Sequence, residues 1–361
     1  MSETENNKSS KKLPNAFLDA HHHFVDTTIY GDSFQAFLAH LIPDFQYLPS
    51  DYKRDVIDPI QKAGVAFHGS VHVECIPDDG IAEAQWITSF TKGNSAPYVK
   101  AIVASCNLAQ DSDKVEEELS KISTQLPHVK GIRWILDCVG KFNGNDATHI
   151  ATKRHDGIDY LRGSEGGYEG HVVSAFETGF GLLDKYNMTF DLQCAPVQLQ
   201  EASKLCRRHP NVKVVIDHLG KPRTLFGANN DKNNSNASMN QGELAVWREG
   251  MKSMAQNSNV YVKISMLGYA IPGWISSQEY LNSMKQLVWE TVTLFGPKRC
   301  MVATNFWKDA ATSDADGMSD VGPDPVQFLE LVYGFLKDDV SDEDLECIFS
   351  KTAASFYGVS I

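Results

Sequence analysis

The sequence predicts an α/β fold, a single (β/α)8 barrel of the TIM type. Short apolar runs alternate with longer amphipathic stretches along all 361 residues. Apolar strands separated by helices are typical of a parallel sheet that is covered on both faces. About eight such repeats close into a barrel. An open, doubly wound sheet is the alternative, but the sequence lacks the Gly-rich fingerprint that usually follows an early strand of that fold.

The predicted elements alternate in order along the chain. The strands are expected at residues 17–23, 67–75, 99–108, 129–136, 189–194, 212–219, 260–267 and 300–306. The clearest helices are expected at residues 113–126, 171–186, 197–208, 241–256 and 278–295. Three longer segments, near 140–170, 225–240 and 309–325, follow strands and should therefore lie on the catalytic face, as lids or substrate walls. The second contains the tract NNDKNNSNASMNQ, which is typical of an inert, disordered insertion.

The composition argues against several classes of partner. A net charge of -13 and a pI near 5.4 disfavour nucleic acid and anionic membranes. No apolar stretch approaches the roughly 20 residues that a membrane span needs. Seven scattered cysteines without a C-x-x-C pair suit a reduced, cytoplasmic protein. Residues 1–14 are polar and lack the apolar region of a signal peptide, so we expect a disordered tail before one domain at 15–361.

The first predicted strand ends in three consecutive histidines. Alternation along a strand places His21 and His23 on one face and His22 on the other. At the C-terminal end of a barrel strand, the face that carries His21 and His23 points into the open end of the barrel, which we call the mouth. Two imidazoles there can ligate one metal ion, or can polarise a carbonyl and move protons without one. A polar strand end capped by histidines, without a catalytic role, is the alternative.

The sixth predicted strand ends in VVIDHLGKP, with Gly220 and Pro222 marking a turn. Alternation predicts that Asp217 and His218 point in opposite directions. His218 could converge with the first-strand pair. A hydrogen-bonded histidine that binds no ligand is the alternative.

Charged residues on two further strands are candidates for the pocket. Lys263, in VYVKISML, could bind an anion, although a lysine at a strand end can also extend to the surface. Glu74 ends the second strand and could point inward, with His72 on the same face two residues earlier.

Taken together, these segments resemble the amidohydrolase superfamily, specifically its amidohydrolase-2 branch, which includes sugar-acid lactonases and a pyrone-dicarboxylate lactonase. The resemblance spans nearly the whole chain, and the order of the segments agrees throughout. The matching segments are LDAHHHF, SVHVEC, AEAQW, VKGIRWIL, DYLRG with GFGLL, TFDLQC, VVIDHLGKP, VYVKIS, FGPKRCM with TNF, and TAASFYG. The resemblance implies a barrel like that of the metal-dependent hydrolases.

The resemblance carries over only in part to the metal site. Superfamily members with a full site use a first-strand His-x-His, a bridging Lys or Glu on the fourth strand, histidines on the fifth and sixth, and an Asp on the eighth. The matching positions are His21, His23 and His218, which could still hold a zinc ion. The other three positions carry Arg133, Gln193 and Asn305. A cation at the bridging position would oppose a second metal ion, so this pattern resembles the lactonase branch, where catalysis can proceed without metal.

The resemblance to lactonases implies that water attacks an activated ester carbonyl. The first- and sixth-strand histidines would stabilise the oxyanion, and an eighth-strand carboxylate would act as general base. Arg133 would clamp a carboxylate of the substrate, for which its planar fork is suited. Lys263, Glu74 and Gln193 complete the expected substrate-binding set.

The general base is the open point of this interpretation. Asn305 stands where the carboxylate is expected, and an amide cannot accept a proton at neutral pH. Asp309, four residues on, could take the role; Glu74 or one of the histidines could serve instead; or hydrolysis could have been lost. Trp307 stands where proline is common, which would reshape the pocket wall.

We therefore expect a hydrolase that acts on an ester bond, opening the lactone of a small sugar-derived or dicarboxylic acid. The alternatives are a metal-dependent amidohydrolase or decarboxylase of the same superfamily, and a non-catalytic barrel that binds a ligand. Both one zinc ion and no metal are compatible with the sequence. The expected partner is a small-molecule substrate, and a homodimer is possible because barrels of this type often pair.

Overall fold

The computed structural model describes residues 12–28, 34–138, 141–142, 145–146, 148–162, 170–223, 225, 239–306 and 323–361. Most of the predicted tail, most of the Asn-rich tract and most of the segment after the eighth strand lie outside these ranges. Trp307 and the candidate base Asp309 are among the residues that are not described.

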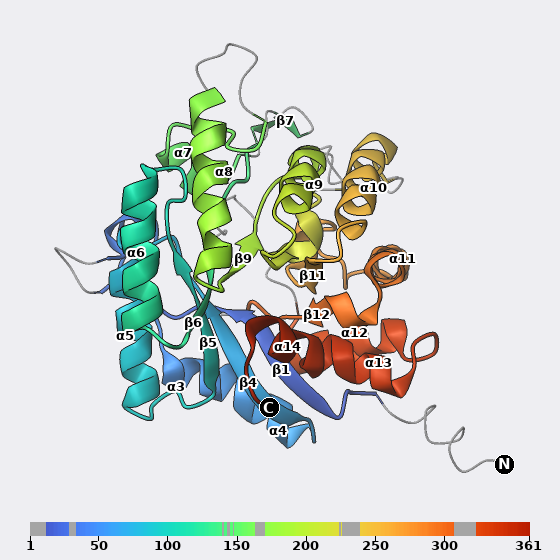
Figure 1. Ribbon diagram of the computed structural model, residues 1–361. Helices are drawn as coiled ribbons and strands as arrows, with labels where there is room; N and C mark the ends of the chain where they lie inside the picture. The colour runs from blue at the N-terminus through green and yellow to red at the C-terminus, as the bar shows by residue number, and fades with distance from the viewer. Residues whose placement is uncertain are drawn as a thin grey trace.

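Eight parallel strands form a nearly closed barrel with helices around it, as predicted (Figure 1). The order of the strands in the sheet is their order in the chain. They are β1 (Ala16–His22), β4 (Ala66–Val73), β5 (Val99–Ser105), β6 (Val129–Arg133), β9 (Thr189–Leu192), β10 (Val214–Ile216), β11 (Val260–Ile264) and β12 (Cys300–Val302). Each strand ends before its predicted C-terminus, because the chain bends there into the loops of the mouth.

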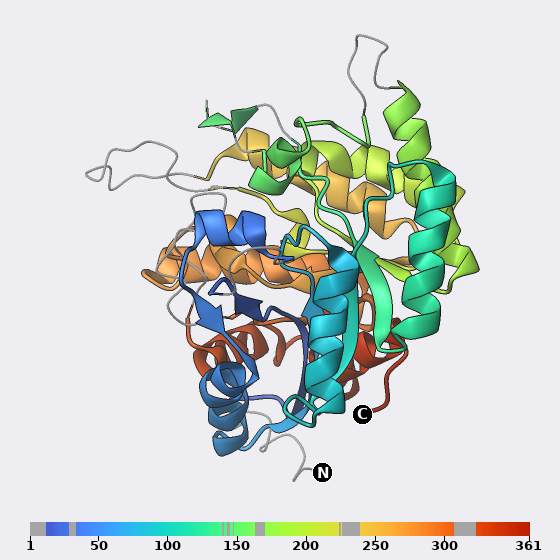
Figure 2. The ribbon, with the colours of Figure 1, turned by 90° about the vertical axis from the view of Figure 1, so that its left-hand side faces the viewer.

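The long helices lie between the strands, and the five predicted ones are confirmed to within a few residues at each end. They are α5 (Gly80–Lys92), α6 (Ser112–Gln125), α8 (Gly170–Lys185), α9 (Leu199–Arg208), α10 (Gln241–Ala255), α11 (Gln278–Phe295) and α12 (Pro325–Leu336). The view in Figure 2 shows α5 and α6 in front of the strands that they cover. Among the helices of the described ranges, none combines the length and apolar character needed to cross a membrane.

Short elements complete the described chain. The helical ones are α2 (Ala36–Leu41), α3 (Pro49–Tyr52), η1 (Lys53–Ile57), α4 (Asp58–Lys62), α7 (Ile150–Arg154), η2 (Pro196–Gln198), η3 (His218–Gly220), η4 (Leu267–Tyr269), η5 (Pro297–Arg299), α13 (Asp342–Glu346), η6 (Cys347–Lys351) and α14 (Thr352–Tyr357). Two small antiparallel pairs are β2 (Val25–Asp26) with β3 (Gln46–Tyr47), and β7 (Lys141–Phe142) with β8 (Asn145–Asp146).

Polar side chains fix where several long helices begin. Asp79, Asn240, Ser277 and Asp324 precede α5, α10, α11 and α12, and each accepts hydrogen bonds from backbone N–H groups of the first turn. Such caps satisfy donors that have no partner within the helix. These four boundaries therefore follow from local sequence.

Small and branched side chains fill the interior of the barrel. They are Leu18, Ala20, Val71, Val73, Ala101, Val103, Val215, Met301 and Ala303. Helix α14 closes the end where the strands begin: Phe356 packs on Tyr261, near the start of β11, with ring centroids 4.9 Å apart. The opposite end is the mouth.

A bulge in β1 turns the first-strand histidines toward the mouth. Asp19 pairs with Ser70 and His22 pairs with His72, so β1 advances by one residue more than β4 between these pairs. Leu18 and Ala20 line the barrel interior. Strict alternation would place the next residue, His21, outside. The extra residue reverses the alternation and brings His21 inward.

The buried carboxyl group of Asp19 joins β1 to β12 at the seam of the barrel. It accepts hydrogen bonds from Tyr52 Oη (2.7 Å), Thr304 Oγ1 (2.5 Å) and Thr304 N (2.9 Å). Asn305 N donates to His21 O at 3.0 Å across the same seam. No paired register joins these two strands in the described residues, so the side chain supplies much of the connection.

Replacing Asp19 should therefore loosen the seam. Asp19→Ala leaves these three donors, and His21 N at 3.3 Å, without their acceptor, and we expect a loss of about 3 kcal/mol in the free energy of unfolding. Thr304→Val removes one of these donors and should cost about 1 kcal/mol. Urea unfolding followed by circular dichroism measures both. Equal costs for the two variants would show that Asp19 does not hold the seam.

Candidate active site

His21 and His23 lie side by side at the end of β1, as predicted. Their Nε2 atoms are 3.2 Å apart. His21 is fully buried, whereas His23 is partly exposed. His22 points away and stacks on Tyr52, with ring centroids 4.3 Å apart. The predicted pairing of the first and third histidines is confirmed, although the bulge and not simple alternation aims them inward.

The contacts of this pair assign the ring protons. His23 Nδ1 lies 2.7 Å from Val73 O, which can only accept, so Nδ1 carries the proton. Burial lowers the pKa of His23 to about 3 and that of His21 well below its usual range, and both rings are neutral at pH 7. His21 Nε2 therefore donates to the bare Nε2 of His23. His21 Nδ1 then accepts from Lys263 Nζ at 3.2 Å.

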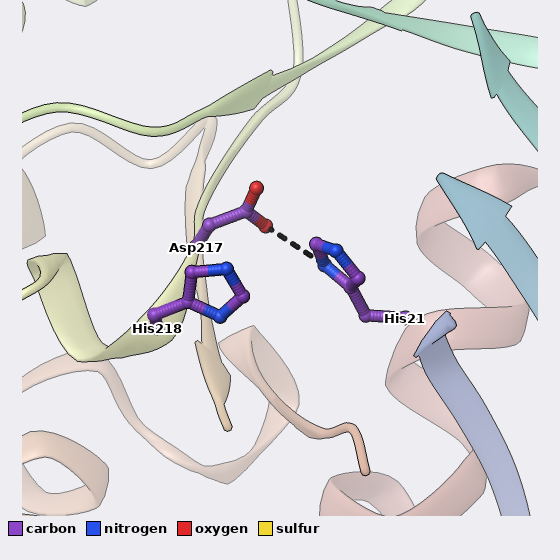
Figure 3. A group of neighbouring side chains, drawn as sticks. All are labelled: His21, Asp217 and His218. Carbon is purple, nitrogen blue, oxygen red and sulfur yellow. Dashed lines mark ion pairs between the residues drawn. The ribbon is translucent and has the colours of Figure 1, made fainter. Parts of the chain in front are cut away.

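A left-handed turn follows β10 and brings two side chains to His21. The four residues from His218 to Lys221 have φ values of 50° to 71°, a region that costs non-glycine residues about 1–2 kcal/mol each. Asp217 Oδ1 lies 3.5 Å from His21 Nδ1, and the His218 ring centroid lies 4.9 Å from that of His21 (Figure 3). The prediction that Asp217 and His218 diverge is wrong, because the strand ends at Ile216 and alternation stops there.

His218 borders the mouth with one nitrogen engaged. Its Nδ1 lies 2.9 Å from Ser265 Oγ, and Ser265 is the hydrogen-bond partner of this ring within the described residues. Burial lowers the pKa of His218 well below its usual range, so the ring is neutral at pH 7. His21 and His23, by contrast, use both of their nitrogens within the protein.

Arg133, Glu74 and Gln193 meet beneath the histidines. Arg133 Nε donates to Glu74 Oε1 at 2.5 Å, its NH1 donates to Gln193 Oε1 at 3.2 Å, and its NH2 donates to the Glu74 carbonyl. NH1 also lies 3.5 Å from Asp217 Oδ2. Glu74 Oε2 accepts from Ile76 N at 2.8 Å. Each oxygen of Glu74 thus accepts a hydrogen bond from the protein.

Lys263 is fully buried and does not extend to the surface. Its Nζ lies 2.5 Å from Asp191 Oδ2 and 3.0 Å from Asp217 Oδ1, in addition to His21. Burial acts to raise the pKa of Asp217, but the interactions that oppose it, of which the positive charge of Lys263 is the largest, hold that pKa well below its usual range. Tyr357 Oη, from α14, donates to Asp191 Oδ2 at 2.8 Å.

Sequence reasoning missed Asp191, Asp217 as an inward group, and Tyr357. Asp191 carried a signal, since it interrupts an apolar strand two residues before Gln193 and so shares its face. Asp217 was hidden by the turn that ends β10. Tyr357 carried no signal, because only the tertiary structure folds α14 under the barrel.

Asn305 lies three residues after the end of β12 and has a buried amide oxygen. Its Oδ1 has no hydrogen-bond partner among the described residues. Because a buried acceptor without a partner is costly, this oxygen suits a water molecule or a hydroxyl of a ligand.

Side-chain atoms of His21, Asp217 and His218 lie within 4.8 Å of one another, a grouping that could in principle hold a metal ion (Figure 3). Lys263 Nζ already contacts His21 Nδ1 and Asp217 Oδ1. A divalent ion within about 4 Å of this ammonium would meet a repulsion of about 8 kcal/mol at an effective dielectric constant of about 20. With Lys263 in place, these residues do not fit a divalent ion.

Comparisons with known proteins agree on the family. A family model described as amidohydrolase matches residues 18–359. The uncharacterized protein y4mH of Sinorhizobium fredii is 30% identical over 181 residues, which cover 50% of each protein. The match thus spans about half the length of that relative.

Solved structures share the fold. An amidohydrolase from Burkholderia multivorans with bound zinc superposes with a TM-score of 0.65 at 18% identity, over 96% of this chain and 100% of that one. A protein from Pseudomonas putida, named as a proposed 2-pyrone-4,6-dicarboxylic acid hydrolase, gives 0.59 at 14% identity, over 97% and 100%. Amidohydrolase 2 from Bifidobacterium longum subsp. infantis gives 0.58 at 17% identity, over 96% and 99%.

His72 allows a test of how the buried histidines respond to pH. It lies outside the mouth, with its ring 5.5 Å from that of His22 and 5.6 Å from that of Phe24, and neither ring nitrogen has a hydrogen-bond partner in the described chain. Burial lowers its pKa well below 6.5. Below about pH 6.5, the unfolded chain therefore binds a proton at His72 that the folded protein does not bind. The free energy of unfolding consequently decreases as the pH decreases.

His72→Phe removes the group that binds this proton in the unfolded chain. The free energy of unfolding of the variant, relative to that of the natural protein, should therefore increase by about 1.4 kcal/mol for each pH unit below 6.5. Urea unfolding at several pH values measures it, with His40→Phe, at an exposed position, as the control for losing a histidine. A pH-independent difference would contradict the neutral state of His72.

Proposed function

Because the chain belongs to the amidohydrolase family, we propose that it is a hydrolase that opens the lactone of a small sugar-derived or dicarboxylic acid. The observation that carries this proposal is the pairing of charges beneath the mouth. Arg133 and Lys263 are held by Glu74, Asp191 and Asp217. The side chains of His21, His23 and His218 at the mouth are neutral imidazoles.

Neutral groups suit water attack on an ester that is already activated. General acid–base catalysis by one side chain contributes about 10²–10⁴ in rate. A rate enhancement of this size is sufficient for a strained or enolic cyclic ester, which is already reactive. It is not sufficient for an amide, because amide hydrolysis needs a stronger nucleophile. An ester-opening reaction therefore fits these groups better than amide hydrolysis does.

In this proposal His218 acts as the general base. Its second nitrogen takes a proton from water as the water oxygen attacks the lactone carbonyl. Asn305 Oδ1 accepts the other hydrogen bond from that water and orients it. When the tetrahedral intermediate collapses, the ring oxygen leaves and takes the proton back from His218.

The charge around the mouth favours a substrate that carries an acid group. Lys221 Nζ and Arg223 NH2 both contact Asp137 Oδ2, at 2.8 and 2.9 Å. Both cations also lie over the Tyr269 ring, whose centroid is 5.9 Å from that of His218. Positive charge beside the base would steer an anionic substrate toward it.

A screen of sugar-acid and dicarboxylate lactones with a pH indicator tests the proposal. We expect ring opening by the natural protein, unchanged by a chelator. His218→Ala should lower kcat/KM by about 10²–10⁴, since it removes the base. His128→Ala, next to the start of β6 and far from the mouth, is the matched control and should leave the rate unchanged.

The outcomes separate the alternatives. A rate abolished by the chelator would indicate the metal-dependent reaction instead. Tight ligand binding without turnover would indicate a binding protein. Full activity of His218→Ala would reject this base while leaving the lactonase proposal intact.

A further inference from the structure

The ammonium group of Lys263 lies in a cage of three acceptors. They are Asp191 Oδ2 at 2.5 Å, Asp217 Oδ1 at 3.0 Å and His21 Nδ1 at 3.2 Å. The contacts to Asp191 and His21 are hydrogen bonds, and Asp217 Oδ1 faces the same ammonium group as an ion pair. Lys263 is fully buried.

The acceptors of the cage are also ligands that divalent transition metals prefer. Carboxylate oxygens and an imidazole nitrogen bind zinc at about 2.0–2.2 Å. The three atoms come from β1, β9 and the turn after β10, so they surround one point. His21 and Asp217 also form a second grouping with His218, whose ligand atoms lie within 4.8 Å of one another. Two members of the cage are thus shared with a cluster that could hold a small cation.

The charge balance explains why this point needs a cation. Three carboxylates, Glu74, Asp191 and Asp217, are buried together with two cations, Lys263 and Arg133. Arg133 is committed to Glu74 at 2.5 Å and approaches Asp217 only to 3.5 Å. Without Lys263, Asp191 and Asp217 would be buried without a close counter-charge, which is strongly unfavourable.

We propose that the Lys263 ammonium occupies the position of a divalent metal ion, so that shortening this side chain turns the cage of His21, Asp191 and Asp217 into a metal site. The natural protein then binds no ion at this point, because its own chain supplies the cation. The inference concerns metal binding and does not rest on the lactonase proposal.

Metal retention by the purified full-length protein tests the proposal. The natural protein and Lys263→Ala are washed with a chelator, incubated with zinc and desalted, and the bound metal is measured by elemental analysis. We expect the natural protein to retain no stoichiometric zinc and Lys263→Ala to retain a single ion per chain. Cobalt in place of zinc should give Lys263→Ala the visible absorption of a low-coordinate site.

Two variants serve as matched controls. Lys263→Arg keeps a cation in the cage and should not gain the ion. Lys263→Ala combined with Asp217→Asn removes a ligand and should lose the ion that Lys263→Ala gained. Zinc should raise the Tm of Lys263→Ala alone, because an ion that binds only the folded state stabilises it.

Two results would overturn the proposal. One is stoichiometric zinc in the natural protein after the same wash, a measurement that does not depend on the folding of any variant. The other is a folded Lys263→Ala that stays metal-free. If Lys263→Ala does not fold even with zinc, Lys263→Ser is measured in the same way, since its hydroxyl can hydrogen-bond the carboxylates; a folded, metal-free Lys263→Ser is equally decisive. Lactone turnover plays no part in either readout.

Discussion

The buried ion network around Lys263 and Arg133 is the interaction on which the rest of the site depends. Two cations and three carboxylates lie in the upper barrel, above an apolar layer of small side chains. Each charge is tolerable there only because an opposite charge is in contact with it. The network holds His21 through its Nδ1, while the carbonyl group of Val73 determines which nitrogen of His23 carries a proton. The chemistry of the mouth is thus determined one layer below it.

This arrangement links distant parts of the chain to the mouth. Tyr357, from the last helix, contacts Asp191; Asp191 contacts Lys263; and Lys263 contacts His21 on the first strand. The polar core therefore helps to close the barrel, as Asp19 does at the seam between β1 and β12. A polar network of this kind favours one arrangement of the strands, because any other would leave a buried charge without its partner.

Much of the fold and part of the site could be predicted from the sequence. The eight strands and five helices were recognisable because hydrophobic periodicity reports directly which face of an element is buried. His21, His23, His218, Arg133 and Gln193 were found because they stand near strand ends, which a barrel brings together. The role of Lys263 was not predictable, since an exposed and a buried lysine look the same in a strand pattern. Whether Asp309 takes part remains a prediction, as this residue lies outside the described ranges.

The sequence by itself determined the architecture, the family resemblance and the set of strand ends that form the mouth. Only the tertiary structure decided how those side chains are used. The bulge in β1 and the left-handed turn after Ile216 both break strand alternation, and they do so where backbone conformation depends on neighbouring strands and loops. Ionic contacts depend on distance in space, which periodicity along the chain does not report. The sequence therefore pointed to the strand ends of the candidate site, whereas packing decided that its buried charges are paired and that its histidines remain neutral.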